Sequence, residues 1–237
     1  MVTENPAVPP ADTPVRRRDL AVARSLDSAR VRSEGRVQRF LDAGFELMAS
    51  AESGKDFTVQ EVVDRSGQSL RSFYQYFAGK HELLLALFDE AIRATADRLG
   101  EQISPEQTPL ERLHRFVVEY YRMCLPAPNG RPSKNNPTPV MAEFCHQLLT
   151  AHQEEATRAF VPVVTLLEQV LRDAVEAGVV RSGFEHEDAA GAILSTIMFN
   201  AAYAPTISGT SDRADGDRSA EQMWAFVSTG ILSGSRG

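Results

Sequence analysis

The stretch from Ser69 to Lys80, SLRSFYQYFAGK, combines aromatic rings with hydrogen-bond donors more densely than an ordinary core helix does. Arg71 and Gln75 are the side-chain types that form paired hydrogen bonds with the edges of guanine and adenine. Hydroxyl and ammonium donors suit phosphate oxygens. In this stretch such donors come from Ser69, Ser72, Tyr76 and Lys80. The chemistry that these types predict is contact with both the bases and the backbone of a nucleic-acid duplex.

Helical spacing separates these side chains into two groups. Leu70, Phe73 and Phe77 follow each other at i, i+3 and i+7, and the two phenylalanines suit packing onto a preceding helix. Arg71, Tyr74 and Gln75 lie away from Phe77 and can face outward. We therefore expect the phenylalanines to hold the helix in place while the polar residues point at a duplex.

The residues before this stretch predict a second short helix. Thr58 is a favoured N-cap residue, and Glu61 three positions later completes a capping-box pattern. Gly67 interrupts the helix, and Ser69 caps the next one. Two short helices joined by Ser66-Gly67-Gln68 predict a helix–turn–helix.

The remaining pattern is helical throughout, with no convincing strand and no internal repeat, so the predicted fold is all-α. The first clear helix covers about 34–52. Long helices are expected at about 82–99, 108–124, 138–152, 154–179, 187–204 and 219–233. We predict three parts: a disordered, Arg-rich N-terminal arm at 1–33, a three-helix DNA-binding domain at 34–82, and a larger helical effector-binding and dimerisation domain at 83–237.

The charge distribution favours an anionic partner for the N-terminal part. The net charge of −7 alone argues against a nucleic-acid binder. However, residues 15–80 hold twelve Lys or Arg against nine Asp or Glu, whereas residues 81–237 hold thirteen against twenty-one. The arginines between residues 16 and 39 suit either a minor-groove arm, which could be flexible or helical, or a solvated tail, and both alternatives remain open.

The whole N-terminal unit resembles the DNA-binding domain of the TetR family of transcriptional regulators. The likeness extends over residues 36–88, from Ala43-Gly44-Phe45-Glu46-Leu47 through FTVQEVV at 57–63 and SFYQYF at 72–77 to Lys80 and Glu82-Leu83. The resemblance implies phosphate contacts by Thr58, Tyr74, Tyr76 and Lys80, and base contacts by Arg71, Gln75 and Leu70. Gln68 departs from the small apolar residue usual in the turn, and Arg71 stands where a small residue is frequent.

The resemblance also implies partners: double-stranded DNA with a pseudo-palindromic operator, a second copy of the chain, and a small-molecule effector. Small residues at 189–192 and 201–202, together with bulky residues of the last helix, suit a dimer bundle. Aromatic and methionine side chains suggest an apolar or aromatic effector. The residues expected to line its site are Phe116, Tyr120, Met141, Phe144, His146, Phe160, Val164, Leu167, Met198 and Tyr203.

Other chemistry finds little support in the sequence. Glu143 and His146 have Glu-x-x-His spacing, but a helical di-iron site needs a second copy and two further glutamates. No common catalytic motif occurs, so we expect no enzyme, cofactor or metal. Cys124 and Cys145 suit buried thiols in the cytoplasm, and no apolar run is long enough to span a membrane. The alternative functions are an interaction protein that uses the helix–turn–helix as a scaffold and, with less support, a helical-bundle metal protein.

Overall fold

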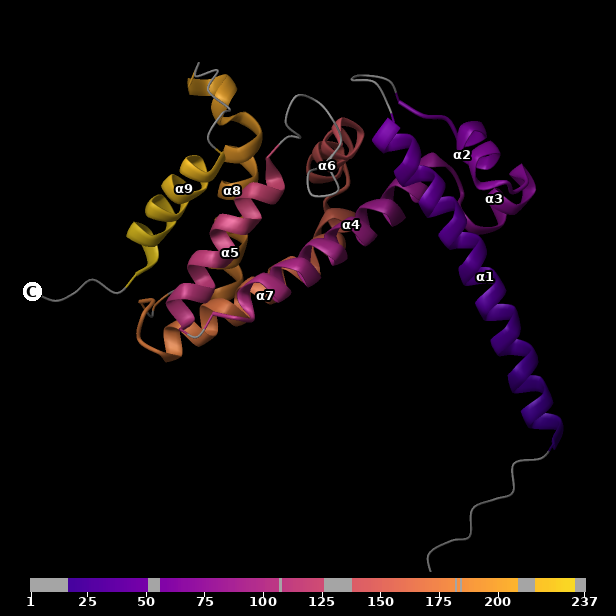
Figure 1. Cartoon of the computed structure of the whole chain (residues 1–237), viewed down its shortest axis with the longest axis horizontal. Helices are drawn as coiled ribbons and strands as arrows, with labels where there is room; N and C mark the ends of the chain where they lie inside the picture. Colours follow the sequence, from indigo (N-terminus) through magenta and orange to yellow (C-terminus); the bar gives the residue numbers. More distant parts are fainter. Residues whose placement is uncertain are drawn as a thin grey trace, which may run out of the picture.

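A computed structural model describes residues 17–50, 56–106, 108–125, 138–181, 183, 185–208 and 216–232. Within these residues the chain forms nine α-helices and one isolated antiparallel bridge, between Val180 and Leu232, so the all-α prediction is confirmed (Figure 1). The helices are α1 (Arg17–Ser50), α2 (Val59–Ser66), α3 (Leu70–Tyr76), α4 (Lys80–Ile103), α5 (Pro109–Cys124), α6 (Pro139–Ala151), α7 (Gln153–Glu176), α8 (His186–Ser208) and α9 (Gly216–Ile231).

The first helix corrects the expectation of a disordered arm before residue 34. α1 begins at Arg17 and continues without a break into the DNA-binding domain, and its N-terminal half extends past the other helices (Figure 1). No Gly or Pro interrupts residues 17–34, and Arg30 forms ion pairs along the helix with Asp27 and Glu34. Residues 1–16 of the predicted arm lie outside the described part of the chain.

The helix–turn–helix forms as predicted, and its local causes are visible. Thr58 and Glu61 make a complete capping box at the start of α2, with the Thr58 hydroxyl accepting from the Glu61 amide. Gly67 ends α2 with a φ of 65°, a left-handed conformation that glycine adopts without a Cβ penalty. The Ser69 hydroxyl accepts from the Ser72 amide and caps α3.

The buried apolar residues of the described chain form two hydrophobic cores, and α4 contributes to both. The N-terminal core joins α1, α2, α3 and the first turns of α4 to α6 and the start of α7. The C-terminal core joins the end of α4 to α5, α7, α8 and α9. The predicted boundary at residues 82/83 falls inside α4, just after its start at Lys80. The division into an arm, a DNA-binding domain and an effector domain remains a prediction.

Polar contacts fasten α5 to its neighbours in the C-terminal region. Arg112 forms a 3.0 Å ion pair with Asp173 of α7, and Arg122 forms a 2.9 Å ion pair with Asp217 of α9. The α8 helix is joined to α5 through the core and through Asn200, described below. Among the described helices, none is both long and apolar enough to cross a membrane.

Candidate nucleic-acid interface and effector region

Interlocked aromatic rings fix α3 against α1. Phe73 is fully buried, and its ring meets the ring of Phe40 edge-on, with centroids 5.4 Å apart. Phe77 meets Phe40 at 6.1 Å and Phe73 at 5.4 Å. Edge contacts of this kind are favoured by the ring quadrupoles and define the orientation of a helix closely. The predicted anchoring by the two phenylalanines is therefore present.

The opposite side of α3 is exposed and polar. Arg71, Gln75 and Tyr74 all face solvent, and Tyr74 is 57% exposed although its ring contacts Phe73. Leu70, predicted from spacing to lie on the same face as the phenylalanines, is also exposed. This face thus offers a guanidinium, an amide, a phenol and one apolar side chain to a partner, which are the types that read base edges and thymine methyl groups.

Two predicted phosphate contacts already have partners within the chain. The Thr58 hydroxyl donates to the Glu61 carboxylate at 2.9 Å as part of the capping box. The Lys80 ammonium is paired with Asp56 and lies 4.7 Å from the centroid of the Phe57 ring. Both side chains stand at helix starts beside α3, so a phosphate would have to compete with these carboxylates.

Tyr76 and Gln68 are partly buried and contact α1. The Tyr76 hydroxyl lies 3.4 Å from the Ser33 hydroxyl, and this hydrogen bond is the main reason that the pKa of Tyr76 is lowered. The Gln68 amide donates to the carbonyl of Arg36 at 2.8 Å. The polar residue that departs from the family pattern therefore links the turn to α1. These two contacts attach the extension of α1 to the helix–turn–helix.

The extension of α1 is basic and exposed. Its exposed arginines include Arg24, Arg30 and Arg32. An α-helix with side chains is about 10–12 Å across, whereas the minor groove of B-DNA is about 6 Å wide. A helix of this kind does not fit into the minor groove, so residues 17–33 suit contact with the phosphate backbone better than the minor-groove entry that was one of the two alternatives.

The ten predicted effector residues do not surround one cavity in the described structure. They divide between the two cores and the surface. Phe116, Tyr120, Val164, Leu167 and Met198 belong to the C-terminal core, Met141, Phe144 and Phe160 pack in the N-terminal core, and His146 and Tyr203 are exposed. Their role in binding an effector remains a prediction, and the largest group of them that lies together is the one in the C-terminal core.

Two neighbouring tyrosines, Tyr120 and Tyr121, bring hydroxyl groups to the C-terminal core. Tyr121 donates to the Asn200 amide oxygen at 3.1 Å, joining α5 to α8. Tyr120 lies beside Cys124, and burial raises its pKa well above the usual value for a phenol. Burial also raises the pKa of the Cys124 thiol to about 12 and that of Cys145 to about 11, so both thiols are protonated and poorly nucleophilic.

The α8 and α9 helices each carry an exposed aromatic side chain. Phe199 is 59% exposed, and its ring stacks against Tyr203 with centroids 4.9 Å apart. Phe226 of α9 is 69% exposed. Other residues considered for a dimer bundle, such as Ala190 and Met223, are instead buried in the chain's own core. The exposed rings are therefore the residues available to a second copy.

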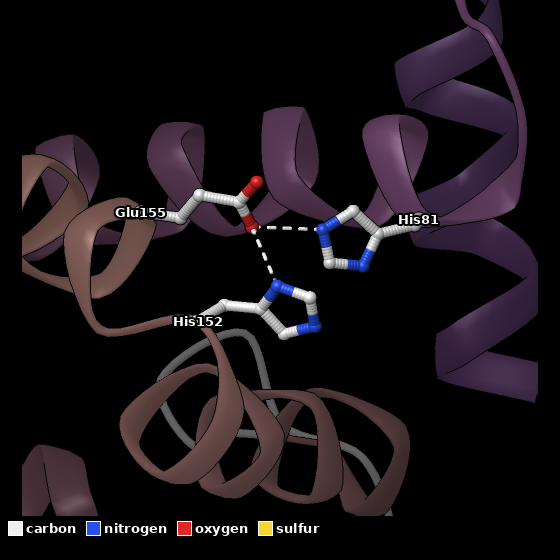
Figure 2. A group of neighbouring side chains, drawn as sticks. All are labelled: His81, His152 and Glu155. Carbon is white, nitrogen blue, oxygen red and sulfur yellow. Dashed lines mark hydrogen bonds and ion pairs between the residues drawn. The ribbon is translucent and has the colours of Figure 1, made fainter.

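One cluster was not anticipated from the sequence. His81, at the start of α4, lies beside His152 and Glu155 at the junction of α6 and α7 (Figure 2). The His-x-x-Glu spacing of residues 152–155 was a visible signal, but only the fold brings in His81, which is 71 positions away in the sequence. The Glu-x-x-His pair considered instead, Glu143 and His146, is exposed and forms no such cluster among the described residues.

The fold and the polar face of α3 together define a helix–turn–helix DNA-binding protein with a C-terminal helical domain. Residues 40–87 match the family model described as bacterial regulatory proteins of the tetR family. The resemblance of the N-terminal unit to the DNA-binding domain of the tetR-family regulators, which the residue pattern indicated, is thus confirmed over these residues.

Known regulators resemble the chain beyond this unit, in sequence and in fold. The fatty acid metabolism regulator protein of Bacillus subtilis is 20% identical over 163 residues, which are 68% of this chain and 79% of that protein. The crystal structure of FadR from the same species in complex with stearoyl-CoA has a TM-score of 0.56 at 16% identity, covering 82% of this chain and 98% of that one. Thermus thermophilus FadR in complex with lauroyl-CoA has a TM-score of 0.58 at 18% identity, covering 84% and 96%.

Proposed function

We propose that the chain is a repressor, rather than an enzyme, that binds a pseudo-palindromic operator as a homodimer in the cytoplasm. Paired α3 helices would enter successive major grooves about 34–36 Å apart. The observation that carries this proposal is the two-sided build of α3. Phe73 is fully buried on one side, while Arg71 and Gln75 are exposed on the other. A helix held this firmly can place donors against base edges with little further ordering.

The residues around α3 could contact the phosphate backbone of the DNA on each side of the bases that α3 would read. Thr58, Ser69, Ser72 and Lys80 stand at the starts of α2, α3 and α4, or within the first turn of α3. The α1 extension would contact flanking phosphates through Arg24 and Arg32. Replacing either arginine by Gln should lower the salt slope of operator binding by about 1 without changing the preferred sequence. Arg172→Gln, on exposed α7 surface, is the matched control.

The dimer would form through the exposed face of α8 and α9. Phe199 and Phe226 are large apolar side chains exposed on these helices, and a contiguous exposed apolar patch marks an interaction site. A Phe199→Glu substitution should shift the chain from dimer to monomer in sedimentation and weaken operator binding, while its secondary structure stays intact. Thr165→Glu, on exposed α7 surface, serves as the control for added charge.

The effector would enter the C-terminal core between α5, α7 and α8. Leu167, Phe116 and Met198 provide an apolar lining, and the hydroxyls of Tyr120 and Tyr121 provide the polar groups. The relatives bound to stearoyl-CoA and lauroyl-CoA make a long-chain acyl thioester a reasonable probe. Release of the operator would follow if the ligand binds better to a conformation whose α3 helices no longer fit DNA.

Selection of binding sequences from random duplex DNA tests the proposal. An enriched palindrome, bound with a steep salt dependence, is the expected result. Adding lauroyl-CoA or stearoyl-CoA to that complex should release the DNA, whereas free coenzyme A should not, because it lacks the apolar chain. Absence of any enriched sequence, with and without these ligands, would favour an interaction protein that keeps the helix–turn–helix as a scaffold.

A further inference from the structure

Three metal-ligand side chains meet where the DNA-binding helices contact α6 and α7. His81 Nε2 lies 2.8 Å from a carboxylate oxygen of Glu155, and His152 Nδ1 lies 3.7 Å from the same oxygen (Figure 2). The two imidazole rings are 4.7 Å apart between centroids. One candidate ligand atom from each residue lies within 4.8 Å of the others.

The elements around the cluster hold its members in place. His81 packs edge-on against Phe144, a buried residue of the N-terminal core, with centroids 5.5 Å apart. His152 is the residue between α6 and α7, where its amide donates to Leu148 and its carbonyl accepts from Ala156. The side chains themselves remain accessible, at 45% exposed for each histidine and 33% for Glu155. A cation could therefore reach the cluster from solvent and keep a bound water.

The chemistry of the cluster suits a borderline divalent cation. Imidazole nitrogens and a carboxylate oxygen bind Zn²⁺ at about 2.0–2.2 Å, so tetrahedral ligand atoms lie about 3.3 Å apart. The two separations from the Glu155 oxygen, 2.8 Å to His81 Nε2 and 3.7 Å to His152 Nδ1, lie on either side of that spacing. Small side-chain rotations would thus bring the three atoms around one ion.

A second histidine–glutamate pair in the chain provides a comparison. His114 Nε2 lies 2.9 Å from a Glu221 oxygen, but the other ring beside it is Trp224, which offers no metal ligand. A hydrogen bond between His and Glu is therefore an ordinary feature here. What distinguishes the first cluster is a second imidazole directed at the same carboxylate.

We propose that His81, His152 and Glu155 form a binding site for a divalent transition metal such as Zn²⁺, with water completing the coordination. The ion would connect the first turn of α4 to the junction of α6 and α7. Because the ligands already lie together, metal binding would stabilise this arrangement of the two regions. The effect on operator binding rests on the proposed function, whereas metal binding itself does not.

Titration of the tag-free, EDTA-treated full chain with Zn²⁺ by calorimetry, and with Co²⁺ by visible absorption, tests the site. We expect one ion per chain and a rise in the melting temperature on adding Zn²⁺. His81→Gln and His152→Gln should each weaken Zn²⁺ binding at least tenfold, and Glu155→Gln should do so too. His114→Gln, from the matched pair, should leave it unchanged. Circular dichroism in EDTA checks that every variant is folded.

The proposal would be overturned if wild-type chain failed to saturate with one equivalent of Zn²⁺. It would also fail if His81→Gln and His152→Gln bound Zn²⁺ as tightly as His114→Gln. These measurements need no DNA, so they stand even if no operator is found. Where an operator is available, Zn²⁺ should change the operator affinity or effector response of the wild type but not of His152→Gln. If Zn²⁺ affected the wild type and His152→Gln alike, a regulatory role of the metal would be rejected, but metal binding at the site would not.

Discussion

The two hydrophobic cores described in this chain differ in the side chains that form them. In the N-terminal core, the rings of Phe40, Phe73 and Phe77 meet at fixed angles and leave α3 one orientation. The C-terminal core is mainly aliphatic, with Phe116 and Tyr120 as its large aromatic pair, tilted by 34° at 5.9 Å. Interlocked rings suit a region that must present a constant surface. Aliphatic packing between long helices suits a region that rearranges around a ligand.

The largest effect expected from this difference follows from removing a ring of the N-terminal core. Phe73→Ala should lower the free energy of unfolding by about 3–5 kcal/mol and abolish operator binding, because the cavity releases α3 from α1. Urea denaturation measures the first effect and fluorescence anisotropy with labelled operator the second. Tyr74→Ala, the exposed neighbour, should change stability by less than about 1 kcal/mol.

Equal losses of stability in Phe73→Ala and Tyr74→Ala would contradict the view that one aromatic face of α3 carries the packing. A Phe73→Leu variant guards against simple failure to fold, since it keeps most of the buried volume. It should bind the operator with reduced affinity but unchanged sequence preference.

The next effect concerns the exposed face of the same helix. Arg71→Ala should relax preference at one base pair by about 1–3 kcal/mol, because a paired hydrogen bond to a base edge is lost. The stability of the chain should remain unchanged, since Arg71 is exposed. Comparing the sequences selected by the two proteins measures the effect. Lys80→Ala is the control, because loss of a phosphate contact would weaken binding to all sequences alike. If Arg71→Ala kept the sequence preference of the wild type, Arg71 would be rejected as a base-contacting residue.

A capping box occurs in each region, which allows the same change to be made twice. Thr58 caps α2 and Thr108 caps α5, each with a glutamate three residues later. Replacing either threonine by Ala should lower the free energy of unfolding by about 0.5–2 kcal/mol. Only Thr58→Ala should also weaken operator binding beyond that loss, because Thr58 is proposed to contact phosphate and Thr108 is not.

This difference is measured as the operator affinity of Thr58→Ala and Thr108→Ala under conditions where both variants are fully folded. Thr58→Ser should restore both capping and affinity, since it keeps the hydroxyl. If Thr108→Ala weakened operator binding as much as Thr58→Ala, the loss would reflect stability alone, and the phosphate contact would be rejected.

The difference between the two regions also explains which features could be predicted from the sequence. Capping residues, Gly67 and the spacing of Phe73 and Phe77 are local signals, so the helix–turn–helix and the exposure of Arg71 followed from them. A buried apolar residue of the C-terminal core has the same sequence signature whether it lines a ligand site or fills a core. The grouping of Met141 with the N-terminal core depended on how α6 packs, which no local pattern records.

The histidine cluster was missed, and the state of the α1 extension was left open, for related reasons. His81 reaches Glu155 only through the packing of α4 on α7. The extension could be either flexible or helical, because it lacks an apolar face directed at a core while its composition favours a helix on propensity alone. Its attachment through Ser33 and Arg36 uses contacts with Tyr76 and Gln68 that are remote in sequence.

The smallest expected effect compares two glycines of α1, one on its exposed surface just after the extension and one in the N-terminal core. A Cβ added at Gly35 would meet nothing within 4 Å, whereas one at Gly44 would lie 2.8 Å from Leu87 Cδ1. Gly35→Ala should therefore increase helical circular dichroism and stabilise the chain by up to about 1 kcal/mol. Gly44→Ala gains the same propensity but must displace a fully buried leucine, so we expect a net loss of about 1 kcal/mol. Equal stabilisation by the two substitutions would mean that the N-terminal core yields more easily than its interlocked rings indicate.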